Sequence, residues 1–469
     1  MERSDKNWKM ATHLEAPTEV DARLRELAVD VVARAMKAGA TAAEAVVREG
    51  TEFSTVVRLG QVETLKESGS CAIGLRAFLG QKSASTYSSD LTADGIDRLV
   101  HGALDLARVT SADPYAGIPE PSQLGALKGD LKLYYDDVYS LAPEERIDYA
   151  RRTERAALDA DPRLKNSDGG SFDAATGHKV LANSHGFVGE FRRSYCSISA
   201  APIAQDENGA MQRDYWFSVA RTVKKLESPE VIGREAARRT LRRLGARKIA
   251  SAEVPVVLDP EVAGSLLNNI FDAVNGDAVY RQSSFLAGKL GEQVAGKNVT
   301  VVDDGTVPEG FGTEPFDAEG VPTRRTVVIE NGVLKSYLLN TYTAKKLGLK
   351  STGNAARGLA GNPGIGAGNL FLQKGERTPQ QIISEIKRGL YVTQFLGFGV
   401  NMVTGDFSRG ASGLWIENGE LAYPVEEITV AGNLKDMLNN ISEIGNDLEF
   451  RGATAAPTLR IDGLMIAGE

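Results

Sequence analysis

The chain has 469 residues, a length that suits two to four domains. Its shares of hydrophobic residues, 42%, and charged residues, 25%, are those of ordinary globular proteins. The net charge of -8 argues against direct contact with DNA, because nucleic-acid-binding proteins usually carry a basic surface.

The lack of a recognisable secretory signal or membrane span and the cysteine usage favour a cytoplasmic protein. No apolar run approaches the ~18 residues that a membrane span needs. Residues 1–19 are polar, lack the apolar core of a secretory signal, and are expected to form a disordered lead-in. Cys71 and Cys196 lie far apart in strand-like contexts, so the sequence predicts buried structural thiols in a reducing compartment.

Two α+β units are predicted in the N-terminal half of the chain, up to residue 248. The first, residues 20–110, is expected to run helix, strands, helix, with its helices at 20–39 and 92–107 and its strands at 44–48, 53–59, 62–67, 70–79 and 83–88. A Pro-, Ser- and Gly-rich linker covers 111–129. The second unit, 130–248, repeats this order, with helices at 143–160 and 229–244 and strands at 164–167, 178–183, 187–200 and 211–220.

The remaining residues, 252–469, favour a β-rich C-terminal domain because glycine becomes frequent and short strand patterns dominate. The domain opens with a strand at 254–258 and an apolar helix at 261–274. Asn331-Gly332 is the strongest short hairpin signal of the chain. Further helices are predicted at 343–347, 378–389 and 434–444, and the last strand at 458–467. The fold class is therefore α+β: two N-terminal α+β units followed by a β-rich C-terminal domain.

The helix at 261–274 follows a buried-type strand, which is a common place for catalytic or metal-binding side chains. It carries Asn268, Asn269 and Asp272 there, and these do not form a strong acid–base or metal constellation. The chain has four histidines and no HExxH motif. His178 and His185 flank a strand and a turn, but two histidines without a placed carboxylate are weak evidence for zinc.

The stretch 354–369 is rich in glycine and has no hydrophobic period. It lacks the spacing and the strand–helix context of a phosphate-binding loop. Long irregular loops are usually functional, so we expect a lid or a loop that contacts a peptide or a partner. The candidate contact residues are Asn354, Arg357, Asn362 and Asn369.

Several motifs together resemble the TldD/PmbA proteins, once described as modulators of DNA gyrase, and the likeness is close to the PmbA (TldE) branch. It covers nearly the whole chain after the lead-in. The set is specific in this order, although each motif alone is weak. The motifs are VPVVLDPEVAG at 254–264, GEQ at 291–293, VVDDGT at 301–306, IENGVLK at 329–335, STGN at 351–354, IGNDL at 444–448 and PTL at 457–459.

The resemblance implies a heteromeric zinc peptidase whose TldD subunit carries an HExxxH motif on the helix equivalent to 261–274. At those three positions this chain has Asn268, Asn269 and Ala273. A further cysteine ligand in the TldD branch lies in a loop that here reads RGATAA at 451–456, without a cysteine. Asparagine is a poor zinc ligand and alanine cannot be one, so no catalytic or metal-binding residue is expected in this chain.

The family resemblance thus implies the non-catalytic subunit of a TldD/TldE-type complex that cleaves unfolded peptides, in proteolysis or peptide maturation. Zinc is expected in the TldD-like partner of a heterodimer, and not in this chain. Two alternatives stay open: an independent metallopeptidase with an atypical site, and a regulatory or scaffold protein without peptidase activity.

Overall fold

The computed structural model describes residues 22–468, so the predicted lead-in at 1–19 lies outside the described part. The first unit consists of two helices and three long strands. They are α1 (Ala22–Lys37), β1 (Ala42–Arg58), β2 (Gln61–Leu79), β3 (Lys82–Ser88) and α2 (Ala93–Val109). The expected order of helix, strands and helix is confirmed. Thr92 caps α2, since its hydroxyl accepts a hydrogen bond from the Gly95 backbone amide.

The second unit repeats this order after the linker, as predicted. Its elements are the 3-10 turn η1 (Pro121–Gln123), α3 (Asp137–Ser140), α4 (Pro143–Leu158), β4 (Leu164–Asn183), β5 (Val188–Gln205), β6 (Met211–Arg213), β7 (Trp216–Ala220), the 3-10 turn η2 (Val223–Lys225) and α5 (Pro229–Leu241). Both units build one antiparallel sheet in the order β3-β2-β1-β4-β5-β6, with β7 paired to β5. The join is the pairing of β1 with β4, from Glu44 opposite Asn183 to Val57 opposite Gly170.

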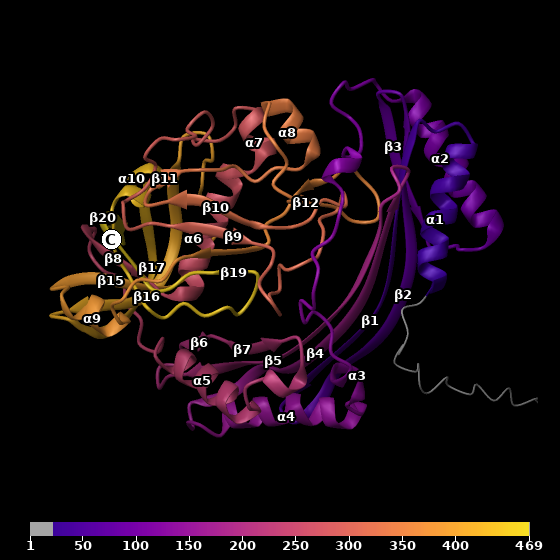
Figure 1. Ribbon diagram of the computed structural model, residues 1–469. Coiled ribbons are helices and arrows are strands. Elements are labelled where there is room, and N and C mark those ends of the chain that lie inside the picture. The colour runs from indigo at the N-terminus through magenta and orange to yellow at the C-terminus, as the bar shows by residue number, and fades with distance from the viewer. Residues whose placement is uncertain (1–21, 469) are drawn as a thin grey trace, which may run out of the picture.

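Side chains of β1 alternate between a helix-covered face and a concave face, as the period of two in a strand requires. Ala43, Ala45 and Val47 pack under α1 and α2, and further along the same face Phe53 packs under α4. The even-numbered residues face the other way. In Figure 1 the helices of these two units lie outside the curved sheet, and the C-terminal half of the chain lies on its concave side.

Strands are longer than predicted in both units. The expected strands 44–48 and 53–59 are one strand, β1, and those at 62–67 and 70–79 are one strand, β2. The residues between them break the hydrophobic alternation, because Gly50 and Glu52 line the polar cavity on the concave face and Glu49 pairs with Arg23 of α1. The break in the hydrophobic alternation therefore marks a change in what the strand faces, and not the end of the strand.

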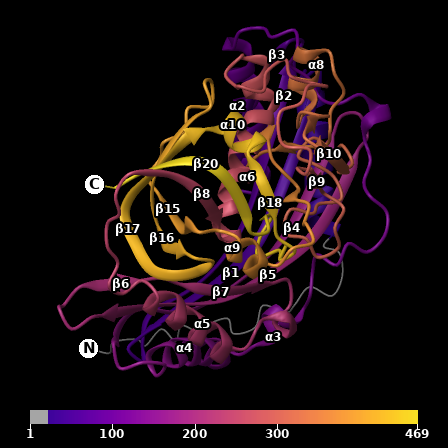
Figure 2. The same cartoon turned by 90° about the vertical axis from the view of Figure 1, so that its left-hand side faces the viewer.

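The C-terminal domain contains a sheet that closes on itself. Its order is β17-β16-β15-β8-β20-β18, and β17 also pairs with β20. Figure 2 shows this ring of strands. The strands are β8 (Ala252–Leu258), β15 (Arg388–Leu396), β16 (Asp406–Glu417), β17 (Glu420–Asn433), β18 (Ile441–Ile444) and β20 (Leu459–Ala467). They share a large hydrophobic core with helix α6 (Pro260–Val274).

A second, five-stranded sheet has the order β11-β10-β9-β14-β19, and a short pair, β12-β13, lies apart from it. These strands are β9 (Val301–Asp304), β10 (Arg325–Glu330), β11 (Val333–Leu334), β12 (Ala355–Ala356), β13 (Gly364–Ile365), β14 (Asn369–Leu372) and β19 (Thr454–Ala455). The remaining helices are α7 (Gly276–Tyr280), α8 (Thr341–Leu347), α9 (Pro379–Ser384) and α10 (Leu434–Asn439). The β-rich character predicted for this domain is confirmed.

Two predicted helices are wrong in length. The helix expected at 378–389 ends at Ser384, and β15 begins at Arg388. The helix expected at 434–444 is α10 followed by strand β18, because Ile441 and Ile444 pair with β20 and enter the core. Within residues 22–468, no helix is long and apolar enough to cross a membrane.

Candidate functional site

Helix α6 follows β8 directly, as predicted, and its start is fixed by Asp259. The Asp259 carboxylate accepts a hydrogen bond from the Glu261 backbone amide and caps the helix, and Pro260 occupies the first turn. The turn at Asp259-Pro260 therefore sets where the helix leaves the sheet. Asn268 and Asn269 lie in the interior of α6, so neither of them caps the helix.

The three positions of the family's metal motif point in different directions on α6. Asn268 is exposed, and its side-chain oxygen accepts a 3.3 Å hydrogen bond from the Thr454 hydroxyl. Asn269 is half-buried, and its side-chain nitrogen has no hydrogen-bond partner among the described residues. Ala273 is fully buried in the core. An amide, an amide and a methyl group offer no acid–base chemistry here.

The loop before the last strand lies beside this helix. Thr454 begins β19, and Arg451 lies just before it. The Arg451 guanidinium donates hydrogen bonds to the Phe217 carbonyl at 2.9 Å and the Glu227 carboxylate at 2.8 Å, and it lies over the Trp216 ring. Arg451 thus ties the loop to β7 of the second unit.

These residues do not fit a zinc ion. Residues 22–468 contain no group of three or more His, Cys, Asp or Glu side chains arranged to hold a metal. His178 and His185 each have another partner: His178 lies 3.6 Å from the Glu190 carboxylate, and His185 Nδ1 lies 2.8 Å from the Pro119 carbonyl. Burial lowers the pKa of His178. Cys196 is buried as predicted, which raises its pKa to about 12, whereas Cys71 is half-buried.

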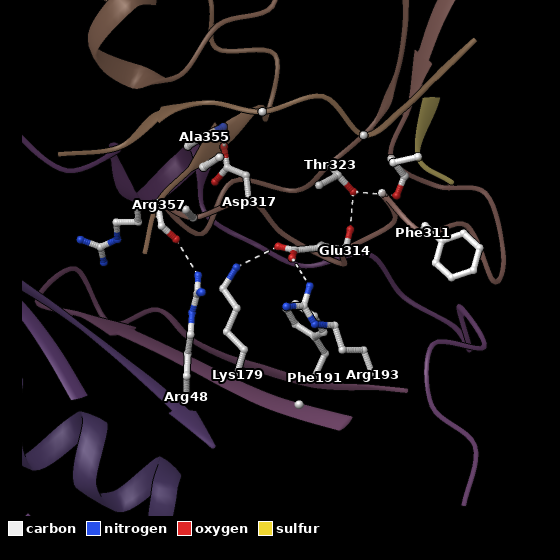
Figure 3. A pocket seen from close by; sticks show the side chains of 18 of the residues that line it. Arg48, Lys179, Phe191, Arg193, Phe311, Glu314, Asp317, Thr323, Ala355 and Arg357 are labelled. Carbon is white, nitrogen blue, oxygen red and sulfur yellow. Dashed lines mark hydrogen bonds and ion pairs between the residues drawn. The ribbon is translucent and has the colours of Figure 1, made fainter. Parts of the chain in front are cut away.

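A cavity of about 530 Å³ lies between the concave face of the N-terminal sheet and the C-terminal domain. This volume is within the range of small-molecule sites. Figure 3 shows that basic side chains reach into it from the sheet and that Glu314 meets them from the C-terminal side. Glycines line much of the remaining wall, including Gly50 and Gly177, which are opposite each other on β1 and β4.

The basic side chains follow from the register of three neighbouring strands. Arg48 on β1 lies opposite Lys179 on β4, and Arg193 on β5 lies opposite Gly177, two residues along from Lys179. All three side chains therefore project from the same face of the sheet. The Arg48 guanidinium donates a 2.6 Å hydrogen bond to the Arg357 carbonyl, while its Nε has no partner among the described residues.

Glu314 is the carboxylate that meets this basic group. It lies 2.8 Å from the Lys179 ammonium and 3.7 Å from the Arg193 guanidinium. Arg221 is buried against Phe311, and among residues 22–468 its hydrogen bonds all go to backbone carbonyls, including that of Gly310 at 2.8 Å. Burial lowers the pKa of Arg221 to about 10, and the charge of Arg193 lowers it further while Glu314 raises it.

Two acids on the opposite wall are held by hydrogen bonds. Asp317 accepts hydrogen bonds from the backbone amides of Glu319, Val321 and Ala355. Burial and the neighbouring Glu319 raise the Asp317 pKa to about 7. Asp303 accepts a 2.7 Å hydrogen bond from Asn354, and burial raises its pKa to about 6.

The stretch 354–369, which we call the strap, forms part of the cavity wall. Of its four predicted contact residues, three are buried and used inside the chain. Asn354 binds Asp303, and Asn369 donates to the Asp304 carbonyl at 2.7 Å and to the Thr313 hydroxyl at 2.8 Å. The Arg357 side chain is 2% exposed. Asn362 is exposed and is the member whose side chain faces solvent.

The strap is attached to all three strands of the first unit. Arg357 pairs with Glu44 on β1 at 2.6 Å, and the Gly361 backbone amide donates to the Ser85 hydroxyl on β3 at 2.6 Å. The Leu359 backbone lies so close to Gly74 on β2 that an added Cβ would be 1.7 Å from the Leu359 carbonyl oxygen. The strap therefore joins the C-terminal domain to the sheet instead of lying free over the cavity as a lid.

Sequence reasoning missed the basic side chains of the cavity. Basic residues within a strand pattern, such as Arg192-Arg193, Arg48 and Lys179, are usually interpreted as a solvated strand face. A polar residue at every second position of a strand indicates a second face, but it does not say whether water or another domain covers that face. The available signal was the pair of glycines at 50 and 177, which suggests a close approach.

Family models match three successive parts of the chain. The PmbA/TldA metallopeptidase domain 1 matches residues 43–107, the central domain 136–244 and the C-terminal domain 251–468. Metalloprotease PmbA of Escherichia coli O157:H7 is 39% identical over 462 residues, which cover 98% of this chain and 100% of that one. A PmbA homolog of Haemophilus influenzae is 36% identical and covers 95% of this chain and 96% of its own.

Solved structures agree with this assignment. A Bacteroides thetaiotaomicron protein described as a modulator of DNA gyrase has a TM-score of 0.89 and 29% identity, covering 96% of this chain and 100% of that one. TldE from Thermococcus kodakarensis has a TM-score of 0.85 at 22% identity, covers 94% of this chain and 100% of its own, and shows the shared fold alone. The chain therefore belongs to the PmbA/TldD metallopeptidase family, in its PmbA (TldE) branch.

Proposed function

We propose that this chain is the non-catalytic subunit of a TldD/TldE-type zinc peptidase complex that cleaves unfolded peptides, in proteolysis or peptide maturation. The observation that carries the proposal is the side-chain chemistry of α6. Where the TldD branch is expected to place two zinc-binding histidines and a general-base glutamate, this chain has an exposed amide, a half-buried amide and a buried methyl group. Losing the general base alone typically costs ~10²–10⁴ in rate.

Geometry around α6 supports the proposal in a second way. The 3.3 Å hydrogen bond between Thr454 and Asn268 places the 451–456 loop beside the helix. These are the two segments that supply ligands in the TldD branch. Their backbones are thus together here, while the side chains that would bind metal are replaced. On this proposal the chain keeps the fold of the family and leaves the metal chemistry to its partner.

Zinc and the cleavage chemistry then belong to a TldD-like partner in a heterodimer. Two features suit this chain to holding an unfolded peptide beside such a partner. One is the cavity between its two halves. The other is β19, an edge strand of the five-stranded sheet, to which an extended peptide can add by backbone hydrogen bonds. Asn362, exposed on the strap, is a candidate contact to peptide or partner.

The test is a peptidase assay with an unstructured peptide on three preparations: this chain, a TldD-like partner, and their mixture. Zinc is counted by elemental analysis in each. We expect a zinc-free, inactive chain whose addition increases cleavage by the partner. The variants Asn268→Ala and Asn269→Ala should leave cleavage by the mixture unchanged, since neither side chain takes part in chemistry.

Other outcomes identify the alternatives. Stoichiometric zinc and cleavage by the lone chain would make it an independent metallopeptidase, with ligands outside α6. A stable complex that has no more peptidase activity than the partner alone would make it a regulatory or scaffold protein. Either result would refute the proposed role.

A further inference from the structure

Cations outnumber carboxylates at the cavity wall formed by the N-terminal sheet. Arg48, Lys179 and Arg193 line this wall, and Arg221 is buried nearby. Glu314 contacts Lys179 and Arg193, and its charge also acts on Arg48 and Arg221. Burial lowers the pKa of Arg48, and so does the charge of Arg193, opposed by Glu314. The repulsion among these cations is therefore only partly compensated within the chain.

The other acids that line the cavity do not supply the missing charge. Asp317 and Asp303 are held in the opposite wall by the backbone amides and by Asn354. Glu49 pairs with Arg23 at 3.1 Å. Glu52 lines the cavity on the same face of β1 as Arg48, but it is exposed, so solvent screens its charge. The basic wall thus has room for a second carboxylate.

Hydrogen-bond donors are also in excess at this wall. Within the described part of the chain Arg193 has a single ion pair, and its 3.7 Å separation is too long for a hydrogen bond. The Arg193 side chain is 54% exposed. The Arg48 Nε also has no partner among residues 22–468, but this atom is itself shielded from solvent. Gly177 lies beneath Arg193, and a Cβ there would be 3.6 Å from the Arg193 Nε, an ordinary van der Waals contact. A planar guanidinium with free donors is suited to a carboxylate.

We propose that this cavity is a binding subsite for a peptide carboxylate, which Arg48 and Arg193 would bind while Glu314 holds Lys179. The inference rests on the proposed function in that the ligand is a peptide. The carboxylate can come from the C-terminus of the peptide or from an acidic side chain, since both present the same group. Glu314 then acts as the internal carboxylate that keeps the basic wall ordered when no peptide is bound.

The experiment measures fluorescence anisotropy with the lone full-length chain and three N-terminally labelled, unstructured peptides. One has neutral side chains and a free C-terminus, the second is its C-terminal amide, and the third is that amide with one internal glutamate. We expect the amide to bind about tenfold more weakly than the free acid, the effect of losing one charge-assisted pair. Binding of the free acid should weaken with added salt.

Two variants probe the wall itself. Arg193→Gln should reduce the preference for the free acid over the amide, while Arg193→Lys restores part of it. Glu314→Gln should strengthen binding of the free acid several-fold, because it removes a competing carboxylate. The matched control is Arg213→Gln, because Arg213 is an exposed arginine on β6 that pairs with Asp168. This variant should bind all three peptides as the unchanged chain does.

The results distinguish the two sources of the carboxylate from the absence of a subsite. If only the free acid binds well, the site recognises the peptide end; if only the glutamate peptide does, it recognises an acidic side chain. Equal binding of all three peptides, no binding up to millimolar concentration, or an unchanged preference in both the Arg193→Gln and Glu314→Gln variants would overturn the subsite. Because no partner or cleavage is involved, such a failure leaves the peptidase-subunit proposal to its own assay.

Discussion

The Arg357 guanidinium lies 2.6 Å from the Glu44 carboxylate, and both side chains are almost completely shielded from water. Glu44 is at the start of the first strand, and Arg357 is in the strap of the C-terminal domain. Arg76 on β2 completes the group at 2.7 Å from Glu44. One buried carboxylate thus connects two arginines, one from each half of the molecule.

Replacing that carboxylate should destabilise the protein strongly. Glu44→Gln removes the carboxylate that both buried guanidinium groups contact and leaves only Glu319, at 4.0 Å from Arg76. Breaking a buried pair in this way typically costs ~3–5 kcal/mol. We expect a large drop in the urea midpoint of unfolding. Arg213→Gln, which removes an exposed ion pair, should leave the midpoint unchanged, because exposed pairs contribute little. Equal midpoints for both variants would contradict the structural role of Glu44.

Gly74→Ala should release the strap without removing any charge. The new methyl group would lie 1.7 Å from the Leu359 carbonyl oxygen, so the strap must move away from β2. We expect trypsin to cleave the folded Gly74→Ala protein after Arg357, and mass spectrometry would identify the fragments. Gly69→Ala on the same strand is the control, because its nearest neighbour, Thr51, is at an ordinary 3.8 Å. Resistance of the Gly74→Ala protein would show that the contact is not tight.

Grafting the family motif onto α6 should not create a metal site. In the triple variant Asn268→His, Asn269→Glu, Ala273→His, one imidazole replaces an exposed side chain and the other replaces a fully buried alanine. Overpacking of this kind typically costs ~1–3 kcal/mol. Two imidazoles without a third protein ligand do not complete a tetrahedral zinc site. Elemental analysis should find no stoichiometric zinc; one zinc per chain would mean that α6 alone determines binding.

Stability should fall as the pH rises from about 4 to about 7. The folded chain raises the pKa of Asp317 from 3.8 to about 7, so in this window the folded state binds more protons than the unfolded state. Asp303, raised to about 6, acts in the same direction. Urea midpoints measured across this range should decline less steeply in the Asp317→Asn variant, even if its overall stability is lower. An identical pH dependence of the urea midpoint in the unchanged chain and in Asp317→Asn would contradict the raised pKa of Asp317.

Local signals in the sequence predicted much of the fold. Asn331-Gly332 and Asn418-Gly419 both have positive φ at each residue, as two-residue hairpins require. The boundaries of α2 and α6 follow from a threonine and an aspartate that cap them. These features depend on neighbours in the chain, so the sequence suffices to find them.

Contacts between residues far apart in the chain could not be predicted, because they do not depend on neighbouring residues. The strap was recognised by its glycines, but Arg357 had the appearance of an exposed contact residue. It is buried because its counter-ion, Glu44, is brought to it by the fold from the other end of the chain. The basic wall of the cavity likewise depends on the register of β1, β4 and β5. No local pattern specifies that register.

The pairing of β1 with β4 also limits how this chain can be divided. The family models place a boundary between residues 107 and 136, yet β1 is an interior strand of a sheet to which both sides contribute. A fragment ending at residue 110 would lack β4 and leave the backbone groups from Glu44 to Val57 unpaired along a new edge. Such an edge is a template for another strand. Fragments of this protein should therefore aggregate edge to edge, and the first unit is not a portable module.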